Sequence, residues 1–361
     1  MPAHRIVRCL SFHAAYSCQD SGVCCGSRWE IQVEPKLERR LRSVLQASSA
    51  RLPNGPDGFL PPAPSRCGVS QATLRLDTDS GACWFRDQTA RRCSIHREFG
   101  QEALPSACRH FPRICVLEPH VVSVSLSHYC PTAVGLLFGP PADFAVIQEP
   151  TAFPTTWLFE GLDASAAYPP FLRPGVLLGF DGLRSFENAS VALLNEGNVE
   201  DGLSRFGAAV ETLRGWTPSS GSLLNQIPRA FEAARAGLVA HPARVDPREM
   251  LRRALPSGIP GDPVLPEARI ELPARPLSGI PDLAMRRYLA SRLIAAWIMF
   301  QGDDLRTVAR YLRLCFETAI LFASVRSSAE PEEVRWREAI RNADLWIIHY
   351  CDPDLLAENL R

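Results

Sequence analysis

The pattern of hydrophobic and polar positions changes in kind along the chain. In the first third, short stretches alternate apolar and polar residues, which is typical of strands with one buried face. The stretches that predict strands in this way are residues 29–34, 73–77 and 121–126. From Phe186 onward the apolar residues recur every three or four positions, which predicts amphipathic helices. The clearest stripe of this kind is Leu203, Phe206, Val210 and Leu213.

Two further signals lie near the N-terminus. Leu37, Leu41 and Leu45 are four residues apart and follow Pro35, a residue favoured in the first turn of a helix, so they predict a short helix. Glycine, proline, serine and asparagine dominate residues 49–67, which we therefore expect to form a loop.

The second half of the chain is expected to be mostly helical. Seven prolines within 256–281 exclude regular helix there and predict an extended connector. Beyond it, apolar spacing predicts three helices, at about 282–301, 303–326 and 331–351. The expected fold class is α+β, with a cysteine-rich metal-binding domain at 1–140 that carries a short sheet and metal-bearing loops. A mostly helical region follows at 141–361.

Composition narrows the function classes. The chain has 361 residues, of which 46% are hydrophobic, so it can bury substantial cores. Its 39 basic and 39 acidic side chains cancel, so we expect no nucleic-acid partner. We find neither a signal-like apolar run at the N-terminus nor a membrane-length one elsewhere, which predicts a cytoplasmic protein without a membrane partner. Cysteines in that compartment stay reduced, so clustered thiols favour metal ligation over disulfides.

Seven of the twelve cysteines lie among glycine, proline, serine, arginine and histidine rather than on an apolar face. These candidate metal ligands are Cys18, Cys24, Cys25, Cys83, Cys93, Cys108 and Cys130. The alternative is that they are small buried hydrophobic residues, as free cysteines often are. That interpretation suits Cys315, which lies in an apolar stretch, but not these seven.

The spacing of the first group indicates a ligand-bearing turn. Ser21 stands where a Cys-x-x-Cys repeat would place its second thiol, between Cys18 and the adjacent pair Cys24 and Cys25. Seven candidates exceed the four thiolates that a tetrahedral zinc ion or one [4Fe-4S] cluster requires. Either a second metal binds or some of these cysteines are not ligands.

The ordered motifs resemble the YkgJ-type cysteine-cluster family, a zinc- or iron-chelating domain to which bacterial flagellin lysine-N-methylases also belong. The matching segments are Cys18-x-x-Ser21-Gly22-x-Cys24-Cys25, Gly-x-Cys83-x-Phe85, Cys93-x-Ile95-His96, Pro105-x-x-Cys108-Arg109-x-Phe111-Pro112 and Cys130-Pro131-Thr132-Ala133. The resemblance covers residues 10–135. It implies a [4Fe-4S] cluster that supports methyl transfer from S-adenosylmethionine to a protein lysine. It also implies that Cys18, Cys24 or Cys25, Cys93 and Cys108 are the first candidates for ligands, followed by Cys83 and Cys130.

Neighbouring side chains have two interpretations each. His96 and His110 could ligate the metal or hydrogen-bond a cluster sulfur, and both could equally be structural. Arg109 and Arg113 could balance the charge of a thiolate cluster or hold a substrate carboxylate.

No phosphate-binding loop, dinucleotide fingerprint, zinc-protease motif or nucleophile elbow is present in the sequence. Three hypotheses remain: a metal-binding protein whose helical half recognises a protein partner, a protein-lysine methyltransferase, or a structural zinc module. The catalytic and S-adenosylmethionine-binding residues are unknown on all three.

Overall fold

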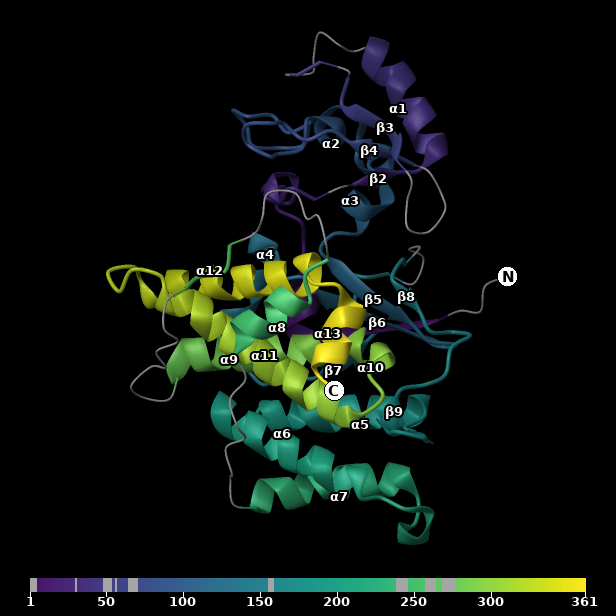
Figure 1. Ribbon diagram of the computed structural model, residues 1–361, viewed down its shortest axis with the longest axis vertical. Helices are drawn as coiled ribbons and strands as arrows, with labels where there is room; N and C mark the ends of the chain where they lie inside the picture. Colours follow the sequence, from purple (N-terminus) through teal and green to yellow (C-terminus); the bar gives the residue numbers. More distant parts are fainter. Residues whose placement is uncertain are drawn as a thin grey trace. The chain divides into compact units, whose positions relative to one another are not determined.

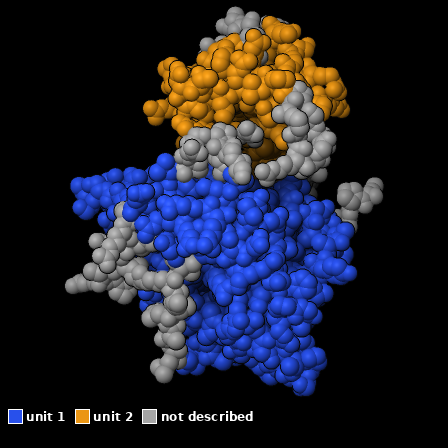
Figure 2. Space-filling view, viewed as in Figure 1, with its two compact units in different colours: residues 1–17, 112–259, 263–361 blue, residues 18–111, 260–262 orange. Residues whose placement is uncertain are grey.

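The structure is a computed structural model that describes residues 5–29, 31–47, 54, 55, 57–63, 71–154, 159–237, 246–256, 264–267 and 277–361. It divides the chain into two compact units (Figure 2). Unit 2 contains Cys18–Phe111, and unit 1 contains the chain before and after that segment. Residues 1–17 and 112–140, which the sequence grouped with the cysteines, therefore belong to the helical unit.

Unit 2 is built on a small antiparallel sheet of strand order β2-β4-β3 (Figure 1). Its strands are β2 (Gln32–Val33), β3 (Phe59–Ala63) and β4 (Gln71–Leu74). Its helices are α1 (Pro35–Ala47), α2 (Ser94–Phe99) and α3 (Ser106–His110), with 3-10 turns η2 (Cys24–Gly26) and η4 (Gln101–Ala103). The core is small, and Cys25, Cys93 and Cys108 pack at its edge. Its buried members include Leu41, Leu45, Phe59, Leu74 and Phe85.

Unit 1 contains a five-stranded sheet of order β7-β1-β6-β5-β8. The strands are β1 (Ile6–Leu10), β5 (Arg113–Leu117), β6 (Val121–Leu126), β7 (Val146–Gln148) and β8 (Leu162–Asp163). Central β6 pairs parallel to β1 and antiparallel to β5, and all six of its residues are buried. A separate hairpin joins β9 (Phe171–Arg173) to β10 (Val176–Leu177).

The rest of unit 1 is helical. Its α-helices are α4 (Pro131–Leu137), α5 (Phe180–Leu194), α6 (Val199–Arg214), α7 (Leu223–Ala236), α8 (Pro247–Arg253), α9 (Gly279–Leu293), α10 (Ile298–Gln301), α11 (Leu305–Ser324), α12 (Glu332–Asp344) and α13 (Pro353–Asn359). Short 3-10 turns are η1 (Ser11–Ala15) and η5 (Pro218–Ser220), and a π-helix, η6 (Leu345–Tyr350), continues α12. Almost every residue of α11 is buried, because α6, α9 and α12 pack around it.

The mixed α+β class and the helical C-terminal region are confirmed. The helix after Pro35, the strand at 121–126 and the helix carrying Leu203 form as expected. The predicted strand at 29–34 forms as the shorter β2, and the one expected at 73–77 is displaced toward the N-terminus as β4, Gln71–Leu74. These belong to unit 2 and the strand at 121–126 to unit 1, so the expected single sheet is two sheets.

Two local predictions were wrong. The stretch 49–67 was expected to be a loop, but Phe59–Ala63 forms β3, an edge strand that tolerates its prolines because an edge leaves amides unpaired. The helix expected at 282–301 is two helices, α9 and α10, which separate at Ala295, where φ is +56°. Most of the proline-rich connector lies outside the described residues. No helix in the described part of the chain is long and apolar enough to cross a membrane.

Candidate metal site

Cys83 and Cys93 close two loops of the same design, ten residues apart. In each loop a β-bridge joins the first residue to the cysteine at the end, Leu76 to Cys83 and Arg86 to Cys93. An aspartate follows the first residue of each loop. The Asp77 carboxylate accepts the Ser80 amide at 2.8 Å. The equivalent Asp87 carboxylate accepts two amides of its own loop at 2.9 Å. Side-chain turns of this kind shape a loop that has no regular secondary structure. Each of the two loops therefore holds its cysteine through contacts within its own sequence.

Backbone contacts join the Cys24–Cys25 turn to both loops. The Cys83 amide donates a 2.7 Å hydrogen bond to the Cys25 carbonyl. Gly22, with φ +63°, packs on the other loop, where an added Cβ would lie 1.6 Å from the Arg91 carbonyl oxygen. Only glycine fits this approach, because a side chain would clash with backbone and would strain the left-handed conformation. The close approach of Gly22 to Arg91 thus brings the Cys24–Cys25 turn against the loop that ends at Cys93.

A fourth segment adds Cys108. It lies on α3, whose first amide, that of Ser106, donates to the Glu34 carboxylate at 2.8 Å. The carboxylate at the end of β2 therefore holds the start of α3. Cys108 interacts electrostatically with Cys24, Cys83 and Cys93.

Five candidate thiols consequently gather in unit 2 and form what we call the thiol cluster: Cys24, Cys25, Cys83, Cys93 and Cys108. The Cys25 thiol is at its centre, because it hydrogen-bonds the sulfurs of both Cys24 and Cys93. Cys83 interacts electrostatically with Cys93 and Cys24, and it belongs to the hydrophobic core of the unit.

The environment separates these thiols by acidity. The hydrogen bond from Cys25, with smaller contributions from the amides of His96 and Ile95, lowers the pKa of Cys93 to about 7 against the opposite effect of burial. The same partner lowers the pKa of Cys24. Donation to two sulfurs raises the pKa of Cys25. Burial raises the pKa of Cys83 to about 12 and raises that of Cys108 well above its usual value.

The chemistry of this donor set fits a thiophilic metal ion or an iron-sulfur cluster, since both take several thiolates from different directions. Among the described residues, no three His, Cys, Asp or Glu side chains already have the arrangement of a metal shell. Cys24 and Cys93 instead interact through hydrogen bonds with Cys25, and Cys83 and Cys108 lie near them without such bonds. Coordination would therefore require the buried thiols to lose their protons, as metal-bound thiols do, and the sulfurs to shift.

Two of the seven predicted ligands lie outside the thiol cluster. Cys18 is exposed, and its sulfur accepts a hydrogen bond from the Asp20 amide at 3.4 Å. Cys130 belongs to unit 1, where it is buried and immediately precedes α4. It caps that helix with its backbone carbonyl, which accepts the Val134 amide at 3.0 Å.

The neighbouring histidines and arginines take different places. His96 lies on α2 with its Nδ1 3.7 Å from the Asp20 carboxylate, and His110 ends α3. Arg109 faces Glu102 at 3.7 Å. Arg113 begins β5 in unit 1, so it belongs to a different unit from the thiol cluster.

Unit 1 contains a second polar group that the sequence did not predict, here called the histidine cluster: His13, His128, Ser291, Arg292 and Asp344. All five are almost completely buried. The Nε2 atoms of His13 and His128 are 3.3 Å apart, and the opposite nitrogen of His128 is 3.3 Å from the Asp344 carboxylate. His128 lies two residues before Cys130, in a segment whose only recognised signal was the cysteine.

Burial and one strong ion pair set the charges of the histidine cluster. Burial lowers the pKa of His13 and of His128. Burial acts to raise the pKa of Asp344, but Arg292 and His128 outweigh it and hold this pKa at about 2. The group is thus a neutral histidine pair beside an ionised Arg292–Asp344 pair, and it connects η1, α9 and the end of α12.

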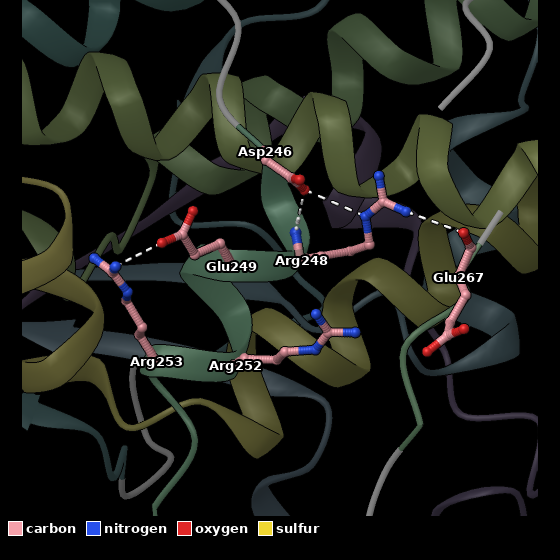
Figure 3. Close-up of a pocket in the computed structure, with 6 residues that line it drawn as sticks. All are labelled: Asp246, Arg248, Glu249, Arg252, Arg253 and Glu267. Carbon is pink, nitrogen blue, oxygen red and sulfur yellow. Dashed lines mark hydrogen bonds and ion pairs between the residues drawn. The ribbon is translucent and has the colours of Figure 1, made fainter. Parts of the chain in front are cut away.

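A surface pocket of about 530 Å³ lies around α8 (Figure 3). Its lining residues are Asp246, Arg248, Glu249, Arg252, Arg253 and Glu267. Arg248 pairs with Asp246 and Arg253 with Glu249, as the dashed lines show. Three cations and three anions cancel, so the pocket has no excess charge that would select an ionic ligand.

The chain matches no family model, no curated protein and no solved structure. The candidate site therefore depends on its own geometry.

Proposed function

We propose that unit 2 binds a thiophilic metal centre, a [4Fe-4S] cluster or a zinc ion, through thiolates of the thiol cluster. The observation that carries the proposal is the convergence of four separate segments at Cys25, Cys83, Cys93 and Cys108. Ordinary packing explains a single buried cysteine, but it does not explain thiols that hydrogen-bond one another at the edge of a core.

The size of the unit supports the same proposal. Its described core has ten buried hydrophobic residues, one of which is Cys83. Small units of this kind commonly depend on a metal or on disulfides for stability, and the described cysteines are free thiols. Methyl transfer from S-adenosylmethionine, which the family resemblance implies, is not needed for this proposal.

Metal analysis of anaerobically purified protein tests it. We expect stoichiometric iron with sulfide and a brown colour for a [4Fe-4S] protein, or stoichiometric zinc in colourless protein. Cys93→Ala should lose the metal. Cys115→Ala, which removes a fully buried thiol on β5 of unit 1, should retain it. Protein without iron or zinc, or equal metal content in both variants, would contradict the proposal.

A further inference from the structure

Arg86 lies among the segments that carry the thiols. Its amide donates to the Cys83 carbonyl at 2.9 Å, and the β-bridge places it opposite Cys93. Its guanidinium rests against Gly26, the residue after Cys25, where an added Cβ would lie 3.7 Å from Nη1. Arg86 therefore adjoins three of the cysteine segments, two through its backbone and the third, at Gly26, through its guanidinium.

The guanidinium of Arg86 lacks an anionic partner in the described part of the chain. Its Nε is buried and donates no hydrogen bond, and the ion pairs there do not include Arg86. Three other arginines of unit 2 differ in that each faces a carboxylate. Arg92, Arg97 and Arg109 face carboxylates at 3.8, 2.9 and 3.7 Å, respectively. Arg39 and Arg40 are exposed on α1, where water solvates them.

A buried donor on a cation is costly unless an anion or another acceptor meets it. Several thiolates around one metal centre carry net negative charge, and that charge needs compensation where the site is partly buried. The proposed function would supply this anion at the sulfurs of the cysteine segments that Arg86 joins, one of which its guanidinium contacts at Gly26.

From this placement we infer that Arg86 is a positioning residue for the metal centre, which balances the charge of its thiolates. The inference rests on the proposed function. It differs from the expectation for Arg109 and Arg113, of which Arg109 faces Glu102 and Arg113 lies in unit 1. The residue that balances the charge of the thiol cluster is thus one that lies at the junction of the Cys83 and Cys93 loops.

Cobalt titration of the full chain tests this inference without any assay of activity. Co²⁺ bound by thiolates gives sulfur-to-cobalt charge-transfer bands, and competition with a chelator gives its affinity. Arg86→Gln removes one partly screened charge near the site, so this variant should bind Co²⁺ about tenfold more weakly than wild type. Arg86→Lys should bind within about threefold of wild type, since it keeps the charge. Arg40→Gln makes the same change in net charge on exposed α1 and should bind as wild type does.

The outcomes separate the two proposals. Wild-type protein that gives no thiolate bands would overturn the proposed function and this inference together. Thiolate bands with unchanged affinity in R86Q would overturn only the role of Arg86, and so would equal weakening in R86Q and R86K, which indicates packing rather than charge. If R86Q shows a lowered Tm, a second variant, Arg86→Met, keeps the aliphatic stem against Gly26. It is expected to weaken Co²⁺ binding as much as R86Q does.

Discussion

Gly22 packs so closely on Arg91 that a Cβ at position 22 would lie 1.6 Å from the Arg91 carbonyl oxygen. This contact brings the turn with Cys24 and Cys25 against the loop that ends at Cys93. The thiol cluster therefore depends on a residue that carries no ligand atom.

Gly22→Ala should reduce the metal content of unit 2 severely, because the new Cβ forces the two cysteine segments apart. Gly100→Ala is the matched control, since Gly100 has φ +78° but nothing within 4 Å of an added Cβ. Both changes strain the backbone by placing a side chain at positive φ, but only Gly22→Ala adds a clash with another segment. Metal analysis of the two purified variants decides the matter, and equal occupancy would show that the contact does not organise the site.

Thiol reactivity should follow the differences in pKa. In metal-free protein at pH 7.5, Cys93, whose pKa is about 7, is largely thiolate, and Cys24 has a lowered pKa and an exposed position. Cys83, whose pKa burial raises to about 12, remains protonated. We expect iodoacetamide to modify Cys93 and Cys24 roughly a hundredfold faster than Cys83, measured by peptide mass spectrometry over time. Uniform rates would mean that the thiols do not interact as described.

Metal removal should loosen unit 2 selectively. A bound metal contributes folding free energy only to the segments that hold it. In hydrogen exchange, a chelator should therefore reduce protection in β4 and α1 and leave α11 unchanged. Equal loss of protection in both units would indicate that the metal does not stabilise unit 2 in particular.

Acid should destabilise unit 1 through histidines whose pKa is lowered by burial, and the half-buried His349 is the one to test. Burial lowers the pKa of His349 to about 4, and Asp344 and Arg292 are the charged groups that act on it. The unfolded chain binds a proton near pH 6.5 and the folded chain does not, so stability is present above pH 6.5 and is lost as the pH falls toward 4. The expected loss is about 1.4 kcal/mol per pH unit for each such histidine.

Urea unfolding at pH 7 and pH 5 measures this loss. His349→Gln, which can still hydrogen-bond the Ser127 hydroxyl now 2.7 Å from Nε2, should be less sensitive to pH than wild type. His120→Gln changes an exposed histidine and should behave as wild type does. An unchanged pH dependence in His349→Gln would exclude His349 as a source of the acid sensitivity.

Local features were predictable from the sequence because they depend on neighbouring residues. The leucines after Pro35 and the apolar stripe with Leu203 each indicate one buried helix face, and both helices form. The β3 strand was not predictable in this way, because Pro61 and Pro62 suggest a turn and only the position at a sheet edge makes them acceptable in a strand.

The site was predictable only in part for a related reason. Cysteines in turn-rich surroundings indicated thiol ligation, but their convergence depends on long-range contacts such as Gly22 with Arg91. The histidine cluster depends on pairs even further apart, since His128 and Asp344 are separated by 216 residues. Periodicity and spacing carry no information about such pairs.

X-ray absorption at the iron or zinc edge of the purified protein tests the central claim most directly. The account predicts a first shell of sulfur at about 2.3 Å from the metal, as thiolate coordination requires, and loss of this shell in Cys93→Ala but not in Cys115→Ala. A first shell of nitrogen or oxygen at about 2.0–2.1 Å would contradict it, because the thiol cluster would then not be the metal site.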